Sequence, residues 1–204
     1  MYIVNVKVLN ELSKIAPKDD VRYYLNGVYV DIQVDHVYYV VTNGHYAVIY
    51  RDEVKDNAHD GLEPIQMIMP ADILKKLKAD KYTDLWPMQK TGDQWQIMDS
   101  IFKPVDATYP DYTKILPKPD AVSAKNPGQQ FNTEYLHKIN ACYQKITGRK
   151  LRFLKVLYNC NNESPALLVG DSFTAVIMPM RHEDNINLPD WYVDLTSHKQ
   201  DKAA

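Results

Sequence analysis

Side chains that could carry catalysis are few and scattered in this chain of 204 residues. The six histidines form no HxH or HExxH pair, and none lies at metal-ligand spacing from Cys142 or Cys160. The chain has no GxxxxGK or GxGxxG phosphate loop and no GxSxG nucleophile elbow, and it contains only seven glycines. The one histidine at a notable place, His45, follows the turn residues Asn43 and Gly44. The sequence therefore predicts a protein that is not an enzyme and that needs no metal or cofactor.

Basic side chains, in contrast, concentrate on three stretches with helical periodicity. Residues 7–18 and 70–81 each carry a net charge of +2 and residues 133–150 carry +3, although the whole chain has a formal charge of -2. If the three helices share one face of a sheet, that face attracts phosphates without reading sequence. The alternative is ordinary solvated helix faces, with lysines favoured near helix C-termini by the helix dipole.

The same three stretches resemble one another in the spacing of their apolar residues. Apolar residues at positions 8, 9, 12, 15 and 16 recur at identical offsets at 135, 136, 139, 142 and 143, and the middle stretch keeps Ile73, Leu74 and Leu77. A strand-like run precedes each stretch, at residues 2–6, 65–69 and 129–131, and β-branched and aromatic runs separated by turns follow it. The pattern predicts an α+β fold of three βαβββ units.

Five segments, in order along the chain, resemble the bacterial sliding clamp, the β subunit of DNA polymerase III. They are DDVRYYLNGVYVDI (19–32), VVTNGHYAVI (40–49), DATYPDYTKILP (106–117), FNTEYLHKI (131–139) and AVIMPMR (175–181). Residues 1–117 resemble the clamp's complete middle domain and residues 129–182 the second half of its third domain. Between them, the Pro-rich residues 118–128 are expected to be a linker, and residues 183–204 a polar tail.

The resemblance implies a DNA-clamp fold, in which helices line a ring around duplex DNA and sheets lie outside. It is consistent with the basic stretches, and together they make duplex DNA the expected partner. The candidate DNA-binding residues are Lys7, Lys14, Lys75, Lys76, Lys78, Lys138, Lys145, Arg149 and Lys150.

The resemblance also implies a hydrophobic pocket that takes short motifs of polymerases, the clamp loader and repair proteins. Tyr46 and Ala47 stand where the family commonly has Arg and Leu, so the peptide preference is expected to differ. Methionines around a proline suit an adaptable peptide groove, although this segment could equally end a core strand. The candidate pocket residues are Leu25, Thr42, Gly44, His45, Tyr46, Ala47, Pro110, Lys114, Ile115, Val176, Met178, Pro179, Met180 and Arg181.

Three functions follow as expectations. The first is a shortened, homo-oligomeric processivity clamp that binds duplex DNA and tethers a polymerase. The second is a non-encircling adaptor or decoy that captures clamp-binding motifs. In the third, Leu188, Trp191 and Leu195 of the tail occupy the pocket of their own or a neighbouring chain.

The compartment is expected to be the cytoplasm. No run approaches the roughly 18 apolar residues of a membrane span. The two cysteines lack CxxC spacing and are expected to be free, buried thiols in a reducing environment.

Overall fold

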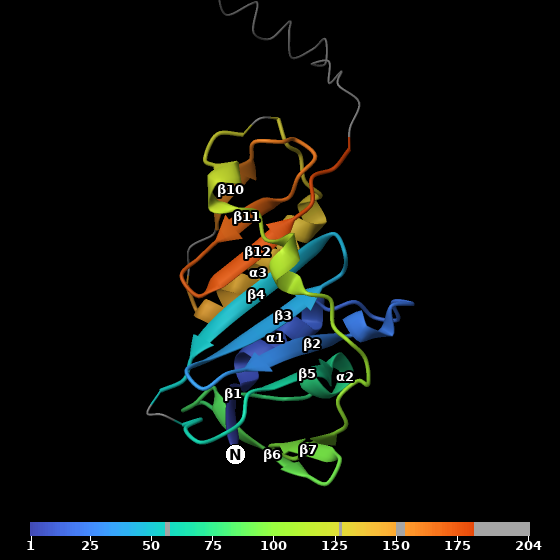
Figure 1. Cartoon of the computed structure of the whole chain (residues 1–204), viewed down its shortest axis with the longest axis vertical. Coiled ribbons are helices and arrows are strands. Elements are labelled where there is room, and N and C mark those ends of the chain that lie inside the picture. The colour runs from blue at the N-terminus through green and yellow to red at the C-terminus, as the bar shows by residue number, and fades with distance from the viewer. Residues whose placement is uncertain (56–57, 127, 150–153, 182–204) are drawn as a thin grey trace, which may run out of the picture.

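The larger of two antiparallel sheets runs through most of the molecule in the computed structural model, which describes residues 1–55, 58–126, 128–149 and 154–181 (Figure 1). In spatial order it contains β5 (Ile65–Pro70), β2 (Gly27–Ile32), β3 (His36–Thr42), β4 (Tyr46–Glu53), β12 (Phe173–Ile177), β11 (Ala166–Val169), β10 (Lys155–Asn159) and β9 (Val122–Ser123). The smaller sheet contains β1 (Tyr2–Asn5), β6 (Leu85–Thr91), β7 (Gln94–Ile97) and β8 (Ser100–Phe102).

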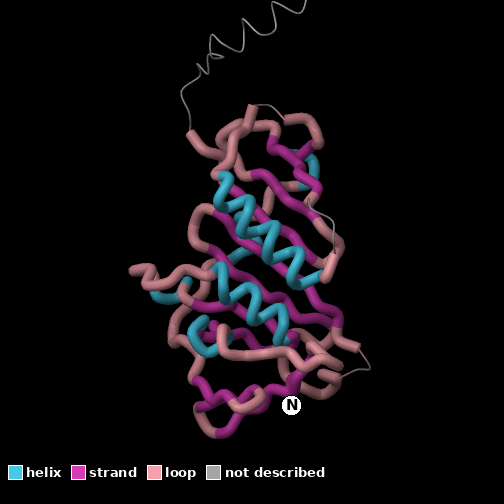
Figure 2. Tube along the Cα trace, turned by 180° about the vertical axis from the view of Figure 1, so that it is seen from behind, coloured by secondary structure: helices cyan, strands magenta, loops and turns pink. Residues whose placement is uncertain are grey.

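Helices α1 (Val6–Ile15), α2 (Ala71–Leu74) and α3 (Thr133–Thr147) lie over one face of the larger sheet (Figure 2). Asn5 accepts a hydrogen bond from the Val8 amide and Asn132 accepts from the Glu134 amide, so an asparagine caps the start of both long helices. Their apolar stripes, for example Leu9 of α1 and Ile139 of α3, are fully buried against the sheet. The α+β prediction is therefore confirmed. The remaining helical turns are 3-10: η1 (Tyr23–Leu25), η2 (Tyr112–Ile115) and η3 (Pro119–Ala121).

The pairing of β4 with β12 joins the N-terminal part of the chain to its C-terminal part. The register runs antiparallel from Phe173 opposite Tyr50 to Ile177 opposite Tyr46. Without this pairing β4 would be an edge strand with a row of unpaired amides and carbonyls. The two parts therefore form one continuous sheet, and the helices α1 and α3 pack beside each other behind the junction (Figure 2).

The helix predicted over residues 70–81 is much shorter than its periodicity indicates. Only Ala71–Leu74 are α-helical, and Lys75 and Lys76 form the turn that follows. The side-chain amide of Asn10, on α1, donates hydrogen bonds to the carbonyls of Leu74, Lys75 and Leu77 at 3.1, 3.1 and 2.9 Å. These carbonyls thus find partners outside the helix, and the chain can leave the helical path while Leu74 and Leu77 stay buried.

Replacing Asn10 by Ala should lower the free energy of unfolding by about 1–3 kcal/mol, because the carbonyls at the end of α2 lose their donor. Urea denaturation followed by circular dichroism measures this loss. Lys18→Ala, at an exposed site just beyond α1, is the control and should change stability by less than about 0.5 kcal/mol. Equal stabilities of the Asn10 variant and the parent would show that the interaction does not hold this turn.

The strand predicted at residues 129–131 is absent, and the strand that precedes α3 is β9, eight residues earlier in the chain. Gln129 is buried, and its side chain bonds to backbone instead of pairing in a sheet. Its amide donates to the carbonyl of Ser164 at 2.6 Å, and its side-chain oxygen accepts from the Asn159 amide at 3.2 Å. Residues of the expected linker thus form η3 and β9, and β9 pairs with β10 at the edge of the larger sheet.

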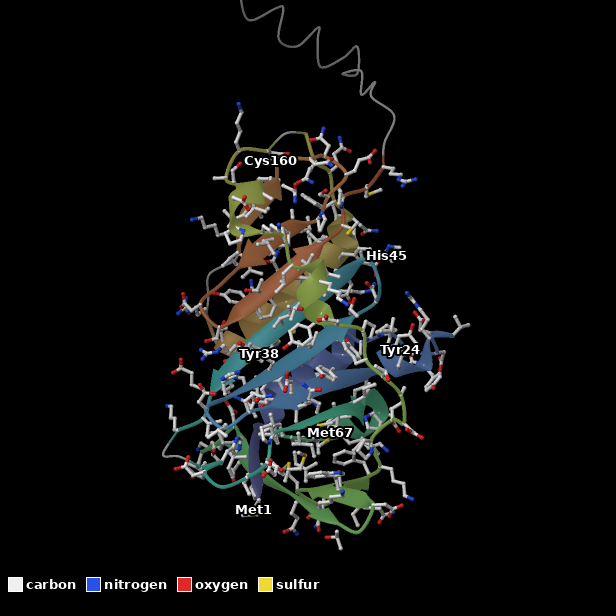
Figure 3. The ribbon with its side chains drawn as sticks, viewed as in Figure 1. Met1, Tyr24, Tyr38, His45, Met67 and Cys160 are labelled. Carbon is white, nitrogen blue, oxygen red and sulfur yellow. The ribbon has the colours of Figure 1, made fainter. Side chains whose placement is uncertain are left out.

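Both cysteines are free, as expected, but only Cys142 is buried. Cys160 is exposed because it follows β10 at a turn on the end of the sheet, where Figure 3 labels it. Its predicted burial was wrong. Among the described residues, no helix is long and apolar enough to cross a membrane.

Candidate functional site

The face of the sheet opposite the helices carries an apolar floor made by alternate residues of three neighbouring strands. Thr42 of β3 lies opposite Ala47 of β4, and Ala47 lies opposite Val176 of β12. Because side chains alternate between the faces of a strand, Val40 joins Thr42 and Met178 joins Val176 on this same face. The β4–β12 junction therefore creates a row of small and aliphatic side chains from segments more than 120 residues apart.

Residues 103–116 cross this face and form the wall of the site (Figure 1). The amide of Val105 donates to the carbonyl of Ile68 on β5 at 2.9 Å, and the ring of Tyr109 stacks on Tyr29 with centroids 4.7 Å apart. Asp111 then caps η2 by accepting from the Thr113 amide. These contacts hold Pro110 and Ile115 beside the floor, with Ile115 40% exposed.

The turn between β3 and β4 forms the rim of the site. Gly44 has a φ of +87°, which suits glycine, and the Asn43 side chain accepts from the amides of His45 and Tyr46. The ring of His45 stacks on Tyr135 of α3, with centroids 5.9 Å apart. The turn thus packs on α3, although His45 lies 90 positions before Tyr135 in the chain.

Arg22 ties the loop before β2 to this rim. Its guanidinium donates to both carboxylate oxygens of Asp20, at 3.0 and 2.8 Å, and to the carbonyl of Asn43 at 3.1 Å. The hydrogen bonds from Arg22 hold the pKa of Asp20 at about 2, below its usual range, so the pair stays ionised at neutral pH. Tyr24, on η1, and His45 mark the two sides of this contact in Figure 3.

These elements enclose a cavity of about 180 Å³. Ten of the fourteen pocket residues predicted from the sequence line it: Leu25, Thr42, Gly44, His45, Tyr46, Ala47, Pro110, Ile115, Val176 and Met178. Tyr46 contributes to the lining although its hydroxyl donates to the carbonyl of Ile15 on the helix side of the sheet. The predicted residues thus come together around one apolar cavity, while their binding of a peptide stays a prediction.

Four predicted residues lie outside this cavity. Lys114 points to Asp111, with 3.6 Å between its Nζ and the carboxylate, and its side chain is largely exposed. Pro179, Met180 and Arg181 line a neighbouring hollow with Gln129. The amide of Met180 donates to the carbonyl of Gln130 at 2.7 Å. After Met178 the chain therefore no longer pairs with β4.

Six further residues, which were not predicted from the sequence, line the cavity: Arg22, Tyr24, Val40, Tyr109, Asp111 and Tyr112. Val40, Tyr109, Asp111 and Tyr112 lie inside the segments 40–49 and 106–117, so alternation along the strand and the PDY motif were available signals for them. Burial raises the pKa of Tyr109, which keeps its hydroxyl neutral at the base of the cavity. Arg22 and Tyr24 lie inside the segment 19–32, but the role of Arg22 depends on its contact with a turn 21 residues away, which the local sequence does not contain.

Replacing Gly44 by Ala should destabilise the protein more than the same change at Gly92, the turn glycine between β6 and β7. Both have positive φ, +87° and +64°, so both variants incur backbone strain of about 1 kcal/mol. At Gly44 the new Cβ would also lie 2.8 Å from Nη1 of Arg22, whereas nothing lies within 4 Å at Gly92. Denaturant unfolding of both variants measures the difference, expected to reach about 1 kcal/mol. Equal losses would mean that the Arg22 contact does not constrain the turn.

The described candidate DNA-binding residues belong to the helices α1 and α3 or to the residues just after α2 and α3. Lys7 pairs with Asp84 at 3.7 Å, Lys14 with Glu11 at 2.6 Å and Lys138 with Glu134 at 2.6 Å, and Arg149 pairs with Asp171. No ion pair is found for Lys75, Lys76, Lys78 or Lys145 within the described residues. Lys150 lies outside the described residues. Since exposed pairs are worth at most about 1 kcal/mol, the paired cations can still exchange partners.

Two antiparallel sheets backed by helices, with an apolar cavity on the opposite face, define the α+β fold of the bacterial sliding clamps. Solved structures bear this out. The β subunit of DNA polymerase III from Pseudomonas aeruginosa matches with a TM-score of 0.66 and 18% identity, over 88% of this chain and 66% of that chain. The sliding clamp from Bacillus subtilis gives 0.65 and 13%, over 89% and 64%.

The β subunit from Thermotoga maritima gives a TM-score of 0.63 at 12% identity, over 89% of this chain and 65% of that chain. The chain thus spans 64 to 66% of the length of these clamps. No protein-family model and no curated protein matches the sequence. The resemblance predicted from five segments is therefore confirmed at the level of the fold, over about two thirds of the length of these clamps.

Proposed function

We propose that this chain is a non-catalytic processivity factor of the sliding-clamp type, which binds duplex DNA non-specifically in the cytoplasm and tethers a polymerase through the apolar cavity. The observation that carries the proposal is the cavity at the β4–β12 junction, where segments distant in the chain supply both walls. An extended peptide with Leu or Phe anchors suits this cavity, because Met178 can adapt its shape and Tyr24 and Tyr112 offer aromatic contact.

The basic helical face supports DNA binding in this proposal. Figures 1 and 2 show the helices and residues 103–116, which wall the cavity, on opposite faces of the larger sheet. A polymerase bound at the cavity would therefore leave the helices free for DNA. Lys75, Lys76, Lys78 and Lys145 are the cations best placed to contact phosphates, since no described carboxylate pairs with them. Contacts of this type give affinity without base specificity, which a sliding factor requires.

In this proposal residues 1–117 act as a complete clamp domain and residues 129–182 as half of one, and the third βαβββ unit takes its first strand from the expected linker 118–128. The order of strands and helices is compatible with three such units, with β9 as the first strand of the third. The resemblance implies rings of twelve units, so a closed ring would take four copies of this chain.

One observation favours the second candidate, an adaptor or decoy that does not encircle DNA. In the complete part of the chain, β5 crosses over from after β4 to pair with β2 at the edge of the larger sheet. At the opposite edge of the larger sheet, β9 pairs with β10, as β5 pairs with β2. Here both strands belong to the same βαβββ unit. The half domain thus covers part of its own edge, which reduces its need for a second copy.

Light scattering across a concentration series, with and without duplex DNA, tests the proposal. A clamp should give a closed oligomer, with four copies expected, and its mass should increase on DNA. A chain that remains monomeric with DNA present would overturn the clamp and support the adaptor. The mass of a single chain is 23.6 kDa, so a tetramer and a monomer differ fourfold.

A further inference from the structure

Exposed apolar side chains gather around the cavity. Among the described residues, eleven large apolar side chains are exposed, and two of them, Ile115 and Met178, line the cavity. Four more lie within two residues of a lining residue: Val21, Tyr23, Leu116 and Met180. Val21 is 95% exposed and stands on the loop that carries Arg22. Such a concentration marks a surface that is covered in some state of the protein.

The chain also contains a segment with large apolar residues after the described part. Residues 188–195 read LPDWYVDL, between the polar runs HEDNIN and TSHKQDKAA. Leu188, Trp191 and Leu195 are the anchor candidates, and they lie outside the described residues. Large aromatic and aliphatic groups of this kind are the usual anchors of a peptide in an apolar pocket.

The chain length between the two places allows them to meet within one molecule. Met178 lines the cavity, and the described part of the chain ends three residues later, at Arg181. Three residues span at most about 11 Å, whereas the seven residues from Arg181 to Leu188 reach about 23 Å. The linker is therefore longer than the distance that the segment has to cover to reach the cavity.

We propose that residues 186–195 occupy the apolar cavity of their own chain and compete there with partner peptides. This inference rests on the proposed peptide-binding function of the cavity and adds its regulation. Tethering through a linker of a few residues gives an effective concentration in the millimolar range. A tail that binds with a Kd on the order of 100 µM would then weaken the binding of an added peptide by about tenfold.

Fluorescence anisotropy with two labelled peptides tests the proposal. The first is the synthetic peptide of residues 183–204, and the second is an extended peptide with one Leu and one Phe anchor. Three proteins are compared: the full chain, a chain ending at residue 182, and the full chain with Leu188, Trp191 and Leu195 replaced by Ala. The third keeps the length and charge of the tail. We expect both peptides to bind the last two proteins about tenfold more tightly than they bind the full chain.

The other results separate the two ideas. If the Leu and Phe peptide binds all three proteins equally, the tail does not occupy the cavity, and the proposed function stands. If only the 183–204 peptide binds the shortened chain, the cavity is a tail site and the proposed function fails. Binding of neither peptide overturns both. Two results together would place the tail in a neighbouring copy and overturn docking within one chain. The affinity of the full chain for the Leu and Phe peptide would fall as the protein concentration rises, and the full chain would form a dimer that is absent from the chain ending at residue 182.

Discussion

Replacing Met178 by Ala is expected to weaken binding of a Leu- and Phe-anchored peptide by about 30-fold, or about 2 kcal/mol, the size of a central hot spot. Met178 lines the cavity and follows β12 directly, two residues after Val176 of the cavity floor. Its side chain is 42% exposed, so it offers apolar surface that a peptide anchor can cover. Truncation removes that surface and leaves the partner's anchor in contact with water. Fluorescence anisotropy of the labelled peptide measures the loss.

Met180→Ala is the matched control. Met180 is the same residue type, two positions away and similarly exposed at 51%. It lines only the neighbouring hollow, whereas Met178 lines both the hollow and the cavity. Its replacement should change the affinity by less than about threefold, and both variants should keep the parent's thermal stability because neither side chain belongs to the core. Equal losses of peptide binding in the two variants would contradict a site centred on Met178.

Charge reversal of Lys75, Lys76, Lys78 and Lys145 to Glu is expected to reduce affinity for a short DNA duplex by at least tenfold at low salt. These lysines lie on the helical face, and no described carboxylate neutralises them. The dependence of log Kd on log salt should also become shallower, by about 0.9 for each phosphate contact that is lost. Anisotropy titrations of a labelled duplex at several salt concentrations measure both quantities.

A second set of four exposed lysines provides the control: Lys90, Lys118, Lys125 and Lys155, which lie on β6, at the start of η3, after β9 and on β10. Their reversal changes the net charge by the same amount but away from the helices. Equal loss of DNA affinity in both sets would mean that net charge, and not the helical face, attracts DNA. Peptide binding should survive in both sets, and a parent chain without measurable DNA affinity would favour the adaptor.

The amino-acid sequence by itself determined the local elements with strong periodicity or turn chemistry. The apolar stripes of α1 and α3 could be predicted because each repeats every three to four residues, and the hairpin at Asn43 and Gly44 because few residues adopt positive φ. The apolar composition of the cavity was also predictable, since most of its residues lie in segments that resemble the sliding clamps. These features depend on neighbours in the chain, which a single sequence contains.

Only the tertiary structure decided where those elements end and which of them meet. Residues 70–81 have a helical pattern. The side-chain amide of Asn10, more than 60 positions earlier, donates hydrogen bonds to the carbonyls at the end of α2, and the helix ends there. Gln129 lies in a strand-like run, but it bonds to the loop after β10 and leaves the strand position to β9. Met178 and Met180 are two positions apart and have the same side chain. Only Met178 lines the cavity, because the pairing of β12 with β4 places the residue that follows β12 beside it. Each of these outcomes depends on long-range hydrogen bonds whose partners the local pattern does not contain.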